Sequence, residues 1–76
     1  VVILRMRSVP AIDITALHAL EKVYANCEEN DVTLVLSHVN EQPRHMMEKA
    51  GFIDKIGEQN LRENIDAALE WAAELV

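Results

Sequence analysis

Two short, mainly apolar runs, residues 1–6 and 32–36, limit what this chain can fold into more than any other feature of its sequence. Neither run alternates between apolar and polar side chains, which is typical of strands in a parallel sheet whose two faces are both covered by helices. Residues 15–28 lie between them and have helical periodicity. The order strand, helix, strand predicts a βαβ unit with a right-handed crossover.

The predicted first helix has a clear apolar face and a clear start. Asp13 is placed to cap it, because its carboxylate can accept a hydrogen bond from a free amide of the first turn. The apolar residues recur at spacings of three and four along one face, and they are Ala16, Leu17, Leu20, Val23, Tyr24 and Cys27.

The second half of the chain predicts two more helices. One starts at residues 40–43, with Pro43 in its first turn, and stops at Gly51, which suits a left-handed conformation. Residues 52–57 then read as a short third strand ending at Gly57, with a loop as the alternative. Asn60 and Glu63 have the spacing of a capping box, and they predict a final helix with an acidic outward face.

Two or three strands with three helices make an incomplete sheet. A chain of 76 residues buries only about 60–65% of the surface that it exposes when unfolded. A first strand that is buried on both faces would leave an apolar edge, which proteins usually cover. We expect the preceding part of the same polypeptide to cover it, and a partner chain or a strand exchange is the alternative.

The composition excludes several classes of partner. The chain has 7 basic and 13 acidic residues, a formal charge of −6, and no basic run, which argues against nucleic acid and anionic lipid as main partners. No stretch approaches the roughly 20 apolar residues that cross a bilayer, so we expect no membrane insertion by this segment. Cys27 is the only cysteine, which excludes an internal disulfide and favours a reducing compartment.

The sequence contains few residues in catalytic patterns. Its two glycines lie apart and form no phosphate-binding loop, and no two of its three histidines have the i, i+4 spacing of a ligand pair. Asp13, Thr15 and His18 supply the residue types of a hydrolytic site, but no oxyanion device accompanies them. We therefore expect no catalytic residues, no metal and no cofactor.

The stronger candidates for a functional site lie along one rim of the predicted sheet. Asp13 and Thr15 lie where the first helix begins, and the free amides there would stabilise an anion or a phosphate attached to Thr15. His38 and Asn40 follow the second strand and should lie on the same rim, where ligand sites of α/β folds gather. The alternative is that Asp13 and Thr15 merely cap the helix and that His38 and Asn40 are polar loop residues.

Residues 2–21, VILRMRSVPAIDITALHALE, resemble the signature of STAS domains. STAS domains occur as cytoplasmic C-terminal domains of SulP-type sulfate and anion transporters and as stand-alone anti-sigma factor antagonists. Thr15 matches the position that the antagonists present for phosphorylation, whereas Ile14 and Ala16 depart from the pattern. Residues 17–21 look like the transporter branch of the family. So does the segment at residues 37–40, which precedes Gln42 and Pro43.

The resemblance implies an α/β fold of the anti-sigma factor antagonist type, with residues 1–76 as the C-terminal portion of one STAS domain and its N-terminal strands missing. It implies a non-catalytic regulatory domain on the cytoplasmic side of a membrane. The partner would be the transporter's own transmembrane domain, a regulatory protein or, in a homodimer, a second copy. The alternatives are a soluble switch protein that releases its partner when Thr15 is phosphorylated and, more weakly, a nucleotide or small-anion sensor that uses the same rim.

Overall fold

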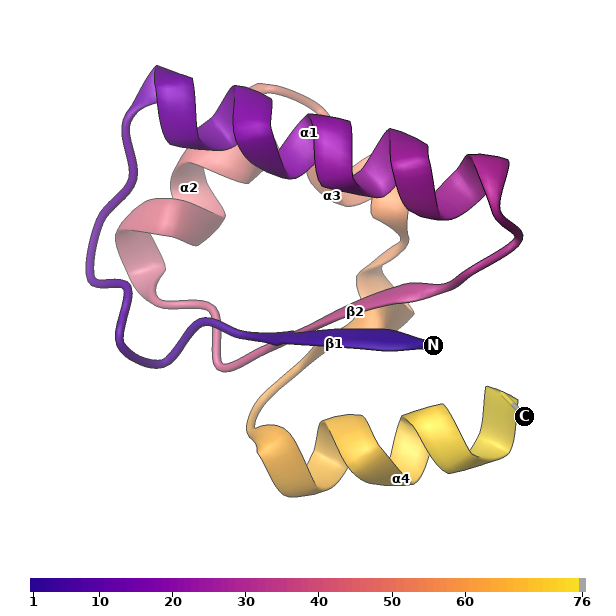
Figure 1. Cartoon of the computed structure of the whole chain (residues 1–76). Coiled ribbons are helices and arrows are strands. Elements are labelled where there is room, and N and C mark those ends of the chain that lie inside the picture. The colour runs from indigo at the N-terminus through magenta and orange to yellow at the C-terminus, as the bar shows by residue number, and fades with distance from the viewer. Residues whose placement is uncertain (76) are drawn as a thin grey trace.

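The computed structural model describes residues 1–75, which form a parallel sheet between two layers of helices (Figure 1). The sheet has the strand order β1-β2-β3, with both strand pairs parallel. The strands are β1 (Val2–Arg5), β2 (Leu34–Ser37) and β3 (Leu61–Arg62). The helices are α1 (Ile14–Glu29), α2 (Glu41–Lys49), α3 (Phe52–Ile56) and α4 (Ile65–Leu75). The predicted α/β class with a parallel sheet is confirmed.

The two faces of the sheet pack against different helices. Leu4 pairs with Leu36 in the strand register, and both contribute to the core beneath α1, α2 and α3. Val35 lies between Leu34 and Leu36, so its side chain points to the opposite face. It is fully buried there, on the side that α4 covers (Figure 1). The apolar runs lack alternation because helices cover both faces.

The first helix begins as its sequence predicts. Asp13 is the N-cap of α1, and its Oδ1 accepts a hydrogen bond of 2.8 Å from the amide of Ala16. Leu17 is buried beneath the helix, and Tyr24 packs edge-on against Phe52 with 5.8 Å between ring centroids. The Tyr24 hydroxyl also donates to the Glu28 carboxylate, and this hydrogen bond raises the pKa of the phenol.

The predicted strand at residues 52–57 is wrong. These residues form α3, a single turn and a half of helix that buries Phe52, Ile53 and Ile56 against the core. Gly51 ends α2 with a positive φ of 73°, as predicted for a left-handed stop, and the chain turns there directly into a new helix. The third strand lies later in the chain, at Leu61–Arg62.

The predicted capping box at Asn60 is also wrong. Helix α4 begins at Ile65, and the amide of Ala67 donates to Oδ1 of Asn64 at 2.8 Å, so Asn64 caps the helix. Asn60 is instead buried at the end of a short 3₁₀ turn, with 8% of its surface exposed. Leu61, which the periodicity assigns to the helix, belongs to β3 and packs against the core.

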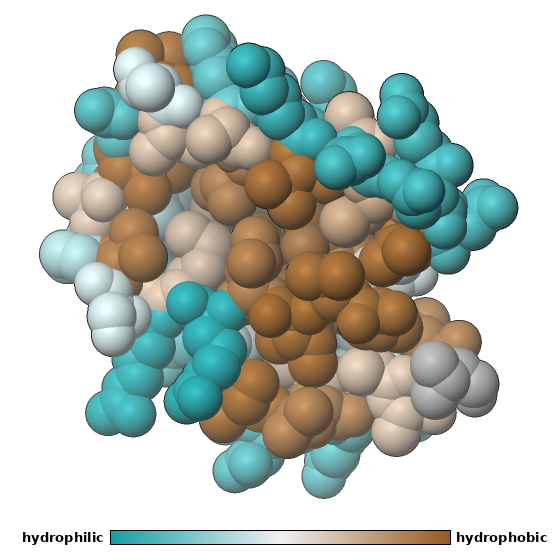
Figure 2. Space-filling view, viewed as in Figure 1, coloured by the Kyte–Doolittle hydropathy of each residue, from teal (hydrophilic) through white to brown (hydrophobic). Residues whose placement is uncertain are grey.

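The outer edge of β1 borders an apolar surface. Within residues 1–75, β1 pairs with β2 on one side only. Figure 2 shows apolar side chains gathered over this edge, between the helices above and below it. Helix α4 carries exposed Asp66, Glu70 and Glu74, as predicted, but Leu69 is also 54% exposed. None of the helices in residues 1–75 combines the length and hydrophobicity that a bilayer crossing requires.

Candidate functional site

The loop that joins β1 to α1 ends at the predicted rim, which lies on the surface of the protein. Asp13 and Thr15 are both exposed, and the Asp13 carboxylate is already bonded to the first turn of α1. Thr15 is the second residue of the helix, and its hydroxyl makes no hydrogen bond to any residue within 1–75. The structure therefore leaves a free hydroxyl where the helix dipole favours negative charge.

Asn40 holds this loop in place. Its Nδ2 donates to three backbone carbonyls, those of Met6 at 3.4 Å, Arg7 at 3.1 Å and Val9 at 2.9 Å. Asn40 precedes α2 but makes no side-chain cap to it, because its amide is turned toward the loop. The structure thus brings Asn40 to the loop that leads to Asp13, as a residue that positions backbone.

Gln42 makes the second anchor of the loop. Its Oε1 accepts from the amide of Ile12 at 2.8 Å, and its Nε2 donates to the Ile12 carbonyl at 3.1 Å. The side-chain amide thus pairs with both backbone groups of the residue immediately before Asp13. Sequence reasoning missed this role, since a glutamine in the first turn of a helix gives no signal of its distant partner.

The two anchors predict a measurable effect on the loop. Replacing Asn40 by alanine removes three carbonyl contacts, two of them partly buried, and should lower the free energy of unfolding by about 1–2 kcal/mol. Urea denaturation measures this loss.

The anchor at Gln42 is tested separately, by hydrogen exchange. Exchange at the Ile12 amide should be faster in a Gln42→Ala variant than in the wild-type protein. Lys49→Ala, at an exposed position, is the control and should change neither the stability nor the exchange rate. Unaltered Ile12 exchange in Gln42→Ala would show that the anchor does not order the loop.

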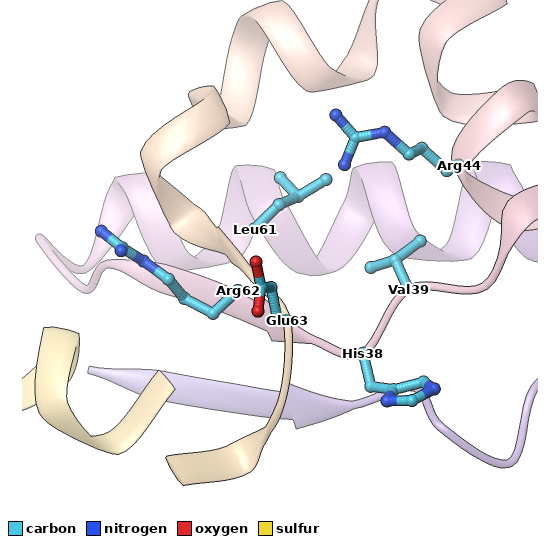
Figure 3. A pocket seen from close by; sticks show the side chains of 6 residues that line it. All are labelled: His38, Val39, Arg44, Leu61, Arg62 and Glu63. Atoms are coloured by element: carbon cyan, nitrogen blue, oxygen red, sulfur yellow. The ribbon is translucent and has the colours of Figure 1, made fainter. Parts of the chain in front are cut away.

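His38 lies on a different part of the rim. It follows β2 with a positive φ of 52°, which is uncommon for a residue with a side chain, and its amide donates to the Arg62 carbonyl at 2.9 Å. Its side chain lines a hollow of about 330 Å³ (Figure 3). The other residues that line this hollow are Val39, Arg44, Leu61, Arg62 and Glu63. Neither Asp13 nor Thr15 lines it.

Both arginines of that hollow are already engaged. Arg44 forms ion pairs with Glu48, at 3.2 Å, and with Glu58, and the hydrogen bond to Glu58 raises the pKa of Arg44. The Arg62 guanidinium stacks over the Trp71 ring, 4.4 Å from its centroid. Arg44 therefore offers little uncompensated positive charge to a ligand, whereas the buried Nε of Arg62 has no hydrogen-bond partner among the described residues.

A wider, shallower hollow of about 850 Å³ lies beside the loop and the start of α2. Its lining comprises Arg7, Pro10, Asn40, Glu41, Gln42 and His45. Its breadth suits contact with another protein surface better than enclosure of a small molecule, since small-molecule sites bury most of their ligand.

The arrangement shows no catalytic device among the described residues. The Asp13 carboxylate is bonded to the Ala16 amide and not to His18, so the three residue types at the start of α1 do not form a relay. Within residues 1–75, no three His, Cys, Asp or Glu side chains gather in a way that would hold a metal ion. The free hydroxyl, the anchored loop and the shallow hollow suit recognition by another molecule.

Fold and site together define a small parallel α/β domain that presents an anchored loop and an exposed helix start. The family model for the STAS domain matches residues 1–68, and the chain belongs to the STAS domain family. The resemblance of residues 2–21 to the STAS signature is thereby confirmed.

The chain is also similar to a solved structure, the crystal structure of a sulfate transporter family protein from Wolinella succinogenes. The two share 41% sequence identity and superpose with a TM-score of 0.91 over 96% of this chain. The chain spans 60% of the length of that structure's chain. No curated protein matches the chain significantly.

Proposed function

We propose that this STAS domain is a non-catalytic regulatory and protein-interaction domain of a SulP-type sulfate or related anion transporter. It acts on the cytoplasmic side of the membrane, and its partner is the transporter's own transmembrane domain or a regulatory protein. The similarity to a sulfate transporter family protein supports the link to transport. The observation that carries the interaction role is the exposed helix start beside an anchored loop.

Ile14 makes this helix start a protein contact rather than a simple cap. Its side chain is 56% exposed, and its neighbours in the sequence are Asp13 and Thr15, both also exposed. An exposed apolar residue flanked by polar groups suits a protein interface, where a central apolar contact is surrounded by polar ones. The anchors at Asn40 and Gln42 lower the entropic cost of binding, because they order the loop in advance.

Substitutions at this helix start test the proposal in the complete transporter. Ile14→Ala should weaken binding of the partner by about tenfold, the effect of losing a buried interface contact. Asp13→Asn removes the charge but keeps a good helix cap, so its effect reports on recognition and not on folding. Lys22→Ala, on the same helix, is the control. Transport rate and partner binding that are both unchanged in Ile14→Ala, Asp13→Asn and Thr15→Ala would refute the proposal.

The exposed Thr15 hydroxyl supports one alternative, a stand-alone anti-sigma factor antagonist. Phosphorylation would add roughly two negative charges at the start of α1, next to Asp13, and would release an acidic partner by repulsion. Mass spectrometry of the protein from growing cells distinguishes the two. A phosphate on Thr15 that dissociates a soluble partner supports the alternative, and its absence alongside a transport defect in Thr15→Ala supports the transporter role.

We also propose that further strands of the same polypeptide cover the outer edge of β1, with a second copy of the chain as the alternative. The support comes from the apolar side chains over that edge (Figure 2) and from the greater length of the similar structure's chain. Val1 just before β1, Val2 on β1, Val23 on α1 and Leu75 on α4 are all more than a third exposed. Covering them would remove one apolar surface that spans both helix layers.

A further inference from the structure

The contact between α1 and α3 contains one hydroxyl that faces two acceptors. The Tyr24 hydroxyl oxygen lies 2.7 Å from Oε1 of Glu28, on the same helix, and 2.7 Å from the backbone carbonyl oxygen of Lys55, on α3. Both distances are ordinary for hydrogen bonds between two oxygens. Tyr24 therefore bridges the two helices at the place where its ring also packs against Phe52 (Figure 1).

The Tyr24 hydroxyl has too few protons for both contacts. A phenol carries a single proton, and a backbone carbonyl or an ionised carboxylate can only accept one. The hydrogen bond to Glu28 raises the pKa of Tyr24, so the phenol keeps its one proton at neutral pH. While the Glu28 carboxylate is ionised, one of the two acceptor oxygens therefore faces Tyr24 with no proton between them.

The ionised carboxylate is the stronger of the two competitors for that proton. Hydrogen bonds to an ionised group are roughly twice as strong as those between neutral groups. The Lys55 carbonyl lies in the last turn of a five-residue helix, where carbonyls lack partners within the helix. An ionised Glu28 thus draws the Tyr24 hydroxyl away from the carbonyl that needs a donor, and the hydrogen bond between the helices is lost.

We propose that Glu28 and Tyr24 form a proton-sensitive clasp between α1 and α3. When the Glu28 carboxyl takes up a proton from solvent, it donates that proton to the Tyr24 oxygen, and the Tyr24 hydroxyl donates to the Lys55 carbonyl. Both contacts then hold a hydrogen bond. Because the closed clasp binds a proton, acid stabilises it and a rise in pH opens it. The inference does not depend on Thr15 or on the proposed partner.

Two other charged groups face the clasp. Glu21 on α1 and Lys55 on α3 line the same hollow of about 460 Å³, and the Lys55 ammonium lies 3.8 Å from Oε2 of Glu21. Protonation of Glu21 would weaken this ion pair, so the pair opposes the clasp in acid. Its side chains are 60% and 31% exposed, and exposed ion pairs contribute little to stability. The acid response of the contact therefore comes mainly from Glu28.

Glu28→Gln tests the clasp, because the glutamine amide donates to the Tyr24 oxygen at any pH. We expect this variant of the purified protein to melt about 2–6 °C above wild type at about pH 8, the shift for one added hydrogen bond. The difference should shrink as the pH falls to about 4, where wild-type carboxyl groups take up protons. Thermal denaturation followed by circular dichroism measures both.

Glu29→Gln is the matched control, since it removes the same charge one position later, at the same exposed end of α1. It corrects for net charge and for the helix dipole. Tyr24→Phe removes the hydroxyl, and in that background Glu28→Gln should gain no more than Glu29→Gln does. Equal gains for Glu28→Gln and Glu29→Gln at every pH, or a Glu28→Gln gain that persists without the Tyr24 hydroxyl, would overturn the proposal.

Discussion

Replacing Phe52 by alanine is expected to lower the free energy of unfolding by about 3–5 kcal/mol, the cost of removing a large aromatic side chain from a packed core. Phe52 is fully buried and meets the edge of the Tyr24 ring. Natural domains have only about 5–15 kcal/mol of stability in total, and small ones lie toward the low end. A domain near the low end of that range would keep only about 0–2 kcal/mol, so the variant should unfold at a clearly lower temperature, which thermal denaturation followed by circular dichroism measures.

Two further variants show whether the loss comes from the core. Phe52→Leu keeps most of the apolar volume and should cost clearly less than Phe52→Ala. Ile14→Ala removes a side chain that is 56% exposed and should change stability by less than about 0.5 kcal/mol. A Phe52→Ala protein that unfolds at the wild-type temperature would contradict the packing of α3 against the core.

The first half of the fold is readable from sequence because several independent signals agree there. The apolar runs at residues 1–6 and 32–36 lack alternation, and both strands are covered by helices on both faces. Between them the periodicity of α1 is long enough to exclude a strand, and Asp13 marks its start. Local propensity, pattern and capping chemistry point to one answer.

The second half is not readable, because its elements are short. Six residues that include Phe52, Ile53 and Ile56 fit a strand or a helical turn equally well, and tertiary packing decides for the helix. The third strand has only two residues, Leu61–Arg62, which is too few to produce any period. Gly51 gives a reliable stop to α2 but does not indicate whether a strand or a helix comes after it.

The candidate site is likewise only partly predictable from the sequence. Residue type and position predict that Asp13 caps α1, and this is confirmed. The direction of a loop side chain depends on distant backbone, so the hydrogen bonds from Asn40 to the loop and the pairing of Gln42 with Ile12 could not be foreseen. Thr15 as a phosphorylation site stays a prediction.

Asn60 is the second residue whose replacement should have a large effect. Its Nδ2 donates to the Ile56 carbonyl at 2.7 Å, and its Oδ1 accepts from the Trp71 indole at 2.8 Å, so one buried amide joins α3 to α4. Asn60→Ala removes both bonds and leaves the carbonyl and the indole N–H without partners. We expect a loss of about 2–4 kcal/mol in the free energy of unfolding, measured by urea denaturation.

Asn64→Ala provides the matched comparison, because the same residue type is replaced four positions later. Asn64 is exposed and caps α4 through one hydrogen bond to Ala67, so its loss should cost only about 1 kcal/mol. If Asn60 were the cap, as its spacing to Glu63 suggests, Asn64→Ala would be nearly neutral and Asn60→Ala would cost the smaller, cap-sized amount. Trp71 fluorescence should change in Asn60→Ala and not in Asn64→Ala, since only Asn60 contacts the indole. An equal cost for both variants, with unchanged fluorescence, would contradict the buried link between α3 and α4.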